Sequence, residues 1–211
     1  MSILTNQEIQ NRKSDLYLQD LSEKQFSQNS IDLSLGKWIF IDKSASLYPQ
    51  AFEELKLGET VVGKNEKEYY KIDLEYFTDF AKGSSGHNFV LYPGMFILAH
   101  TNEFFGTKPK TDLCWQFLLK STAARNGLDH CLAGFVESGY FSPLCLELYS
   151  HAPVEIRYGD LIGQAILHTT TDKSVDYTIK GSYQSTTNID ELRKNWKPED
   201  ILPGKIKNKY E

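Results

Sequence analysis

The feature that most limits the fold of this chain is a series of short apolar runs bounded by turn signals. Pro93-Gly94 separates two of these runs, and Gly159-Asp160 separates two others. Runs of about four to eight residues bounded by Gly, Pro, Asn or Asp are typical of β-strands. No helical period persists through the middle of the chain, so we predict an all-β sandwich or barrel. The predicted strands are Ser30–Leu35, Trp38–Ile41, Phe89–Tyr92, Met95–His100, Leu113–Leu119, Leu144–Tyr149, Val154–Tyr158 and Leu161–His168.

Some of these strands also carry a predicted burial pattern. Ser30–Leu35 alternates strictly between polar and apolar residues, which predicts a half-buried strand with Ile31, Leu33 and Leu35 facing inward. Leu113–Leu119 is apolar nearly throughout, so we expect burial on both faces or nearly so.

Two short helices are expected outside this β region. Thr5 and Glu8 have the spacing of a capping box, which predicts a helix near residues 6–13. A second short helix is predicted near Ile189–Asn195. The polar and less periodic stretch Tyr48–Gly86 predicts a surface excursion that carries short strands.

Length and charge narrow the class of protein. The 211 residues favour one domain over residues 1–211. A net charge of −5 argues against a general nucleic-acid binder, which usually carries a basic field, but it leaves a small anionic ligand possible. No apolar run approaches the ~20 residues of a membrane span, and no signal peptide pattern is present. We therefore expect no membrane partner and a cytoplasmic location.

Zinc chemistry is not expected. Cys114, Cys131 and Cys145 lie far apart without a C-x-x-C pair, and each is predicted to be a buried thiol. The chain also lacks H-E-x-x-H and the zinc deaminase pattern, H-x-E followed by P-C-x-x-C.

A group of cations and hydroxyls follows directly after the predicted strand Leu113–Leu119. Lys120, Ser121, Thr122 and Arg125 could hold phosphate oxygens at the point where the chain leaves the core. A solvated turn is the more common outcome for such a short cluster. The pattern alone favours the turn.

Glu147 is a lone carboxylate in an apolar strand. The period of two places it with Cys145 and Tyr149, opposite Leu144, Leu146 and Leu148. If its face is solvated, Glu147 is an ordinary outward residue; if that face lines a pocket, a carboxylate beside a cation is the setting of a general base. The pattern alone favours the first case.

Seven segments match, in the same order along the chain, the motifs of one known family. Together they resemble the motifs of the dCTP deaminase branch of the dUTPase-like family, from Ile3 to about Gln184. No single segment would suffice, and the resemblance depends on their order. The segments are Asn29-Ser-Ile-Asp-Leu-Ser-Leu-Gly36, Tyr92-Pro-Gly-Met-Phe-Ile-Leu-Ala99, Lys120-Ser-Thr-Ala-Ala-Arg125, Ala133-Gly-Phe-Val-Glu-Ser-Gly-Tyr140, Leu146-Glu-Leu148, Gly159–Gln164 and Lys180-Gly-Ser-Tyr-Gln184.

The resemblance implies a distorted jelly-roll-like β-barrel and a homotrimer with active sites at subunit interfaces. It implies hydrolytic deamination of dCTP to dUTP, with Mg²⁺ on the triphosphate and no zinc, and it makes inhibition by dTTP plausible. The Pro93-Gly94 segment is expected to be a hairpin, and residues 170–211 a segment that closes over the active site.

The resemblance also implies roles for individual residues. Glu147 would be the general base that activates water, and Ser121, Arg125 and the carbonyl of Ala133 would hold that water and the reacting centre. The residues expected to bind substrate are Lys120, Thr122, Glu137, Lys180, Tyr183 and Gln184.

Departures from the family pattern leave alternatives open. The family aspartate that faces the deoxyribose is Glu137 here, and Leu119 replaces the glycine before the Lys120 motif. The substrate could therefore carry a modified base or sugar. The alternatives are a bifunctional enzyme that forms dUMP and pyrophosphate from dCTP, a dUTP diphosphatase, and a non-catalytic trimer that binds nucleotide. We favour deamination to dUTP, because Glu137 suits attack at the α-phosphorus less well than aspartate would.

Overall fold

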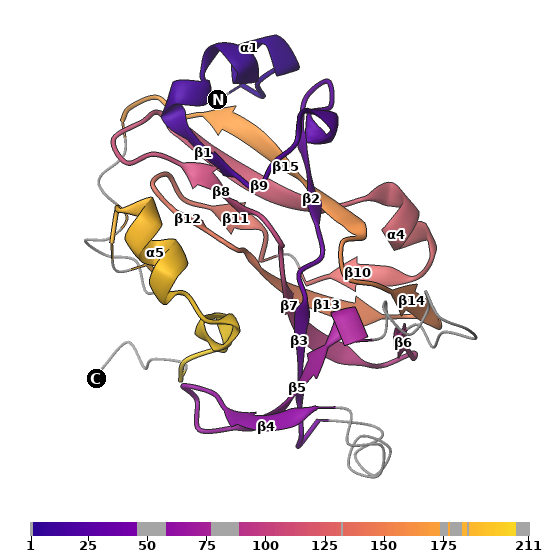
Figure 1. Cartoon of the computed structure of the whole chain (residues 1–211). Helices are drawn as coiled ribbons and strands as arrows, with labels where there is room; N and C mark the ends of the chain where they lie inside the picture. Colours follow the sequence, from indigo (N-terminus) through magenta and orange to yellow (C-terminus); the bar gives the residue numbers. More distant parts are fainter. Residues whose placement is uncertain are drawn as a thin grey trace.

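The computed structural model of this chain describes residues 2–45, 58–76, 89–131, 133–173, 177, 183–184 and 186–205. Strands dominate it, arranged in sheets of six, four, three and two strands that do not close on themselves (Figure 1). The predicted all-β class is confirmed. Within the described ranges, no helix combines the length and apolar character needed to cross a membrane.

The described elements have the following bounds. The helices are α1 (Asn6–Asn11), α4 (Ser121–Arg125) and α5 (Ile189–Asn195), with the 3-10 turns η1 (Lys13–Asp15), η2 (Glu23–Gln25) and η4 (Pro198–Ile201). The strands are β1 (Leu16–Gln19), β2 (Ile31–Ser34), β3 (Trp38–Asp42), β4 (Glu59–Val62), β5 (Glu68–Asp73), β6 (Phe89–Leu91), β7 (Phe96–His100), β8 (Phe104–Thr107), β9 (Leu113–Leu119), β10 (Leu128–His130), β11 (Phe135–Val136), β12 (Phe141–Ser142), β13 (Cys145–Ser150), β14 (Val154–Ile156) and β15 (Leu161–Thr169).

The six-stranded sheet, in the order β10-β13-β7-β3-β5-β4, positions the candidate site. All of its pairings are antiparallel, and Glu147 on β13 lies opposite Leu98 on β7, which in turn lies opposite Phe40 on β3. The four-stranded sheet, β11-β9-β15-β2, packs Trp115 and Phe117 into the main core. Glu147, Leu98 and Phe40 therefore form a row across one face of the six-stranded sheet.

Both predicted helices are present, with the expected caps. The Thr5 side chain accepts from the Glu8 amide while the Glu8 carboxylate accepts from Thr5, and α1 ends at Asn11, within the predicted stretch. The helix α5 has the predicted bounds, and the Asn188 side chain caps it. Such caps depend only on residues three or four positions apart, so the sequence shows them directly.

The strand β2 is more buried than the alternation predicted. Asp32 and Ser34, expected to face solvent, are each 7% exposed. Asp32 pairs with Lys120, and Ser34 donates its hydroxyl and amide hydrogens to the buried Glu103. The half-buried prediction is therefore wrong, because polar partners from distant segments cover the second face.

The Pro93-Gly94 turn is present, but the hairpin expected around it is not formed. Gly94 has a φ of +88°, which glycine tolerates and other residues rarely adopt. The strand before the turn, β6, pairs with β14, whereas the strand after it, β7, pairs with β13 and β3. The turn thus passes the chain from one sheet to another.

Three smaller expectations also need correction. In β9, Leu118 is 42% exposed, so this strand is not buried on both faces. Cys131 is exposed rather than buried. The cluster after β9 forms the one-turn helix α4 instead of a plain turn.

The polar stretch Tyr48–Gly86 contains more core than its composition suggested. The strand β5 lies inside the six-stranded sheet and buries Tyr69, Tyr70 and Ile72. The interpretation as a surface excursion is therefore wrong for β5. Residues 46–57 and 77–88, with the Gly83–Gly86 segment, lie outside the described part.

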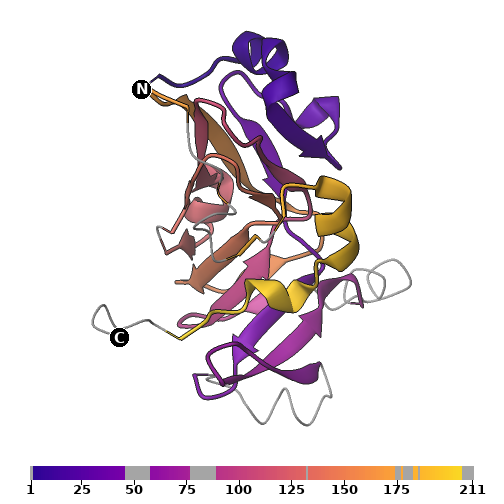
Figure 2. The same ribbon diagram turned by 90° about the vertical axis from the view of Figure 1, so that its left-hand side faces the viewer.

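The C-terminal residues 196–205 pack against the six-stranded sheet, whereas the helix α5 before them lies beside the three-stranded sheet of β1, β8 and β12 (Figures 1 and 2). Ile201 and Leu202 bury their side chains against Phe40, Tyr69 and Leu98 in a second hydrophobic cluster. The ammonium group of Lys71 lies 2.6 Å from Glu199 and 2.9 Å from Glu59. These contacts fix the segment to the same sheet that carries Glu147.

Candidate active site

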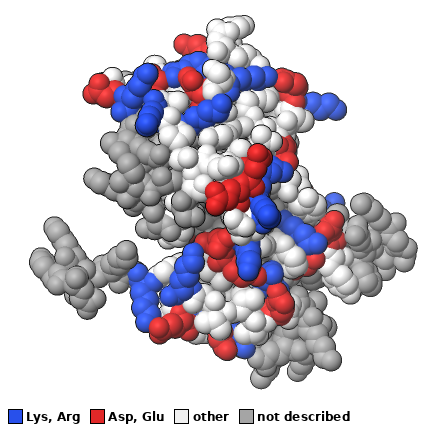
Figure 3. Space-filling view, turned by 60° about the vertical axis from the view of Figure 1, so that its left-hand side comes forward, with Lys and Arg blue, Asp and Glu red and all other residues white. Residues whose placement is uncertain are grey.

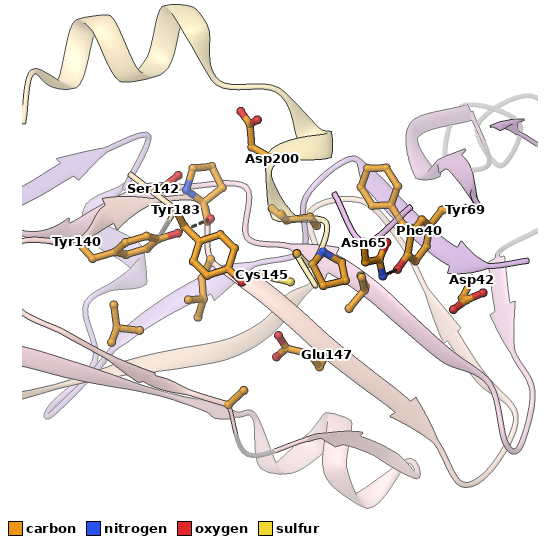
Figure 4. A pocket seen from close by; sticks show the side chains of 18 of the residues that line it. Phe40, Asp42, Asn65, Tyr69, Tyr140, Ser142, Cys145, Glu147, Tyr183 and Asp200 are labelled. Carbon is orange, nitrogen blue, oxygen red and sulfur yellow. Dashed lines mark hydrogen bonds between the residues drawn. The ribbon is translucent and has the colours of Figure 1, made fainter. Parts of the chain in front are cut away.

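A large pocket lies between the six-stranded sheet, the segment 133–140 and the C-terminal residues (Figure 4). Its volume is about 1120 Å³. Four of the predicted site residues line it, namely Glu147, Ala133, Glu137 and Tyr183. Concave pockets with a few polar groups among apolar walls are the usual sites of small-molecule ligands.

Glu147 faces this pocket because of its place in β13. The strand alternates between half-buried and buried positions, with Cys145, Glu147 and Tyr149 on the half-buried side. The alternation predicted for this strand is confirmed, and the pocket decides between the two alternatives left open for its face. Glu147 is not an ordinary solvated residue.

The carboxylate of Glu147 meets a buried histidine. Its Oε2 atom lies 3.3 Å from Nε2 of His130, and neither atom makes a well-aligned hydrogen bond within the described part of the chain. The His130 ring packs against Phe117 at a centroid separation of 4.9 Å. The backbone fixes the pair as well, because the Cys131 amide donates to the Glu147 carbonyl at 3.0 Å.

No pattern in the sequence pointed to His130 as a site residue. It stands at the end of the three-residue strand β10, and only the pairing of β10 with β13 brings it beside Glu147. A lone histidine near an apolar strand is far more often a packed core residue than part of a site. His130 reaches Glu147 through the pairing of two strands and not through its spacing in the sequence.

Cys145 lies next to Glu147 on the same face but is not an activated nucleophile. Burial raises the pKa of the Cys145 thiol well above its usual value, and the charge of Glu147 together with a hydrogen bond to it adds to the shift. A reactive cysteine needs the thiolate form. The carboxylate is therefore the better candidate for proton transfer.

The segment that carries Gln184 is tied to the turn before β12. The Gln184 side chain accepts from the Phe141 amide at 2.8 Å and donates to the Gly139 carbonyl at 2.9 Å. The residue is only 4% exposed, so it holds Tyr183 against the pocket. Lys180, the other residue of this predicted motif, lies outside the described residues.

The structure places the basic cluster away from this pocket. Lys120 forms a 2.6 Å ion pair with the buried Asp32. Ser121, Thr122 and Arg125 are exposed on α4, and none of them lines the pocket. Within one chain, the two halves of the predicted site are therefore separate.

The cations in the described pocket lining already have acidic partners. Lys67 lies 2.6 Å from Asp42, and Lys205 lies 2.6 Å from Glu66. Charges of both signs are interspersed over the face shown in Figure 3. Among described residues, no group of three or more His, Cys, Asp or Glu side chains could hold a metal ion. A polyanionic ligand would need further cations.

The fold and the pocket together define a mainly β protein with a candidate proton-transfer carboxylate in a nucleotide-sized pocket. Residues 3–170 match the family described as dCTP deaminase-like. A solved structure, 2'-deoxycytidine 5'-triphosphate deaminase from Agrobacterium tumefaciens, has a TM-score of 0.53 and 20% identity over 79% of this chain and 48% of that chain. The chain belongs to the dCTP deaminase-like family.

Relatives named "dCTP deaminase, dUMP-forming" are similar in sequence. The protein of Nanoarchaeum equitans is 29% identical over 80% of this chain and 84% of its own length. Those of Methanosphaerula palustris and Corynebacterium jeikeium are 29% and 34% identical, each over 51% of this chain. These two matches span only 59% and 60% of the relatives' lengths.

Proposed function

We propose that this protein deaminates dCTP and that it carries the product on to dUMP and pyrophosphate. The observation that carries the proposal is Glu147, whose carboxylate faces the pocket beside the buried His130. The family supports deamination of dCTP as the chemistry. The relatives' names favour dUMP over dUTP as the final product. We therefore prefer the bifunctional enzyme, which forms dUMP and pyrophosphate, to the deaminase that releases dUTP.

In the deamination step, Glu147 takes a proton from a water molecule whose oxygen bonds to C4 of cytosine. The C4–N4 bond then breaks, and the amino group leaves as ammonia after it gains a proton. General base catalysis of this kind contributes about 10²- to 10⁴-fold to a rate. The buried His130 lies beside this carboxylate, with its Nε2 atom 3.3 Å from Oε2.

Ser121 and Arg125 would hold the attacking water and the charge that develops at the ring, with help from the Ala133 carbonyl. Preorganised donors and cations are effective where negative charge develops. Because Ser121 and Arg125 lie outside the pocket of their own chain, a second copy must supply them.

A homotrimer provides that second copy. Phe135 is 62% exposed and Leu118 is 42% exposed on neighbouring strands of the four-stranded sheet, and Leu161 at the start of β15 is 50% exposed. Large exposed apolar groups on one sheet favour contact with another chain. Such a contact would also bring cations to a triphosphate, whose oxygens would carry Mg²⁺. We assign Mg²⁺ no ligand from the protein.

Formation of dUMP would need a second carboxylate for the α-phosphorus. Glu137 lines the same pocket as Glu147 and is exposed there. Its side chain is one methylene longer than the family aspartate, so the water would have to sit correspondingly farther from the backbone. Inhibition by dTTP remains a further prediction of the family resemblance.

One experiment separates these products. Purified protein is incubated with dCTP and Mg²⁺, and ammonia, dUTP, dUMP and pyrophosphate are followed over time. We expect ammonia and pyrophosphate in equal amounts, with dUMP as the nucleotide. Accumulation of dUTP without pyrophosphate would restore the simple deaminase, and the absence of ammonia would refute deamination of dCTP.

A further inference from the structure

His130 is a buried residue that the proposed deamination step leaves without a role. It is 6% exposed, and its Nε2 atom has no hydrogen-bond partner among the described residues. The Oε2 atom of Glu147, 3.3 Å away, is buried and unpartnered in the same way. Buried polar atoms without partners are costly and uncommon in folded proteins. Two such atoms that face each other are therefore candidates for a role in the reaction.

A second buried histidine shows what a structural contact looks like in this protein. His100 is 5% exposed, and both of its ring nitrogens have partners in the backbone. Its Nδ1 atom donates to the Thr101 carbonyl at 2.8 Å, and its Nε2 atom accepts from the Trp38 amide at 3.3 Å. The ring of His130 packs on Phe117, but its Nε2 atom faces a carboxylate instead of the backbone. Packing therefore accounts for the ring of His130 and not for this nitrogen.

The chemistry of the two facing atoms fixes the position of one hydrogen. An ionised carboxylate oxygen can only accept a hydrogen bond, so the Nε2 atom of His130 must carry a hydrogen toward Oε2 of Glu147. An Nε2 atom without hydrogen would point its lone pair at the lone pairs of the oxygen. The Nε2 atom of His100, in contrast, must be free of hydrogen because it accepts from an amide. The two histidines are thus expected to differ at Nε2.

The contact between His130 and Glu147 is close to a hydrogen bond but is not aligned as one. Its 3.3 Å is slightly longer than the usual range of about 2.7–3.2 Å. Catalytic hydrogen bonds are often long or poorly aligned before the substrate binds, and they tighten in the complex. The backbone on both sides is already fixed, because the Cys131 amide donates to the Glu147 carbonyl and His130 lies opposite Leu148. Rotation of the two side chains is therefore enough to align the contact.

The two carboxylate oxygens of Glu147 lie in different settings. The side chain is 27% exposed and lines the pocket, although its Oε2 atom is buried. The other oxygen, Oε1, is therefore the one that meets a water molecule in the pocket. A general base acts only within hydrogen-bond reach of the proton that it takes. A contact that fixes Oε2 would thus also fix the reach of Oε1.

We propose that His130 is a positioning residue for Glu147: when a nucleotide is bound, its Nε2–H group donates to Oε2 and turns Oε1 toward the attacking water. This inference rests on the proposed function, in which Glu147 takes a proton from that water. His130 keeps its own hydrogen throughout, and Glu147 passes the proton of the water to the departing amino group. Because the acceptor is ionised, this hydrogen bond is stronger than one between neutral groups.

Substitutions at His130 separate the donor from the ring. His130→Phe keeps an aromatic ring against Phe117 and should lower kcat for ammonia release by about ten- to hundredfold, the usual effect of losing a hydrogen bond to a charged group. The KM for dCTP should change by less than about threefold, since the lost contact acts on the base and not on the nucleotide.

Two amide variants form a matched pair. His130→Gln puts an amide N–H near the place of Nε2 and should keep kcat within about fivefold of the wild type, whereas the shorter amide of His130→Asn should lose as much as His130→Phe does. Equal losses of kcat in the Gln, Asn and Phe variants would overturn the inference, as would wild-type kcat in His130→Phe.

Nitrogen NMR tests the inference without turnover. In protein with nitrogen-15-labelled histidine near pH 7, the Nε2 signal of His130 should be that of a protonated nitrogen, and that of His100 should be that of an unprotonated one. The spectrum of His130→Gln, which lacks one histidine, assigns the signal. An unprotonated Nε2 in His130 would overturn the inference even if the protein releases ammonia from dCTP. Absence of ammonia with the wild-type protein would instead refute the proposed function.

Discussion

The strand β13 and the helix α4 carry the two halves of the predicted site in opposite settings. Glu147 on β13 is fixed by sheet pairing on both sides, and its Oε2 atom lies 3.3 Å from Nε2 of the buried His130. Ser121 and Arg125 on α4 are exposed, and no ion pair joins Arg125 to another described residue. The setting of Glu147 can be described from one chain, whereas Ser121 and Arg125 would act on a substrate only if a second copy brought them to the pocket.

A similar difference separates Lys120, the residue before α4, from the residues on the helix. Lys120, directly before the helix, is held by the buried Asp32, so part of the basic cluster is structural. Its neighbours on the helix have no such constraint. Four experiments test whether β13 and the residues around α4 differ in this way.

The largest effect is expected at Glu147. Glu147→Gln should lower kcat for ammonia release by about 10²- to 10⁴-fold, since the amide cannot accept the proton of water. The melting temperature should change little. Asp129→Asn is the matched control, because this carboxylate lies on the neighbouring strand β10 but is 60% exposed. Full activity of Glu147→Gln would exclude it as the base.

Arg125→Ala should lower kcat by about 10²- to 10³-fold, as removal of a positioned charge-stabilising group does. Its stability should be unchanged, because the side chain is exposed. Mixed trimers of Arg125→Ala and Glu147→Gln chains should regain about a quarter of wild-type activity if each site takes one residue from each of two subunits. No recovery after subunit exchange would place both residues in one subunit.

The ion pair before α4 should matter for stability. Lys120→Met leaves the buried Asp32 carboxylate without its cation and should lower the free energy of unfolding by about 3 kcal/mol. Lys13→Met, which breaks the exposed pair with Glu23, should cost less than about 1 kcal/mol. Urea denaturation measures both. Equal losses of unfolding free energy would mean that the Lys120–Asp32 pair contributes no more to stability than an exposed ion pair does.

The smallest effect is a pH dependence in the sheet that carries β13. Burial lowers the pKa of His100 to about 4, and its Nε2 accepts from the Trp38 amide. The unfolded chain, with a histidine pKa near 6.5, binds the proton first as the pH falls. Stability is therefore complete above about pH 6.5 and should be lower by about 2 kcal/mol at pH 5.

Thermal or urea unfolding between pH 7 and 4.5 measures this slope. His100→Gln should flatten it, because glutamine does not titrate. His151→Gln, at a 60% exposed histidine, should leave the slope as it is. If the slope is the same in all three proteins, the loss at low pH does not come from His100.

Several features of the fold and one of the site could be predicted because their sequence signals are local. The alternation around Glu147, the cap of Thr5 on α1 and the bounds of α5 all follow from residues a few positions apart. The order of motifs identified the family, which the match over residues 3–170 confirms. The homotrimer, Mg²⁺ and the individual residue roles stay predictions.

Local residue patterns were enough to predict the all-β class, the two short helices and the face of β13 on which Glu147 lies. No such pattern showed that this face lines a pocket, that His130 lies beside Glu147, or that Lys120 covers Asp32; these follow from the folded arrangement of the chain. The pairing of β6 with β14 and the packing of residues 196–205 beside the pocket follow from it as well. The reason is physical: periodicity and caps act within one or two turns of chain, whereas strand pairing and burial depend on segments that are distant in sequence.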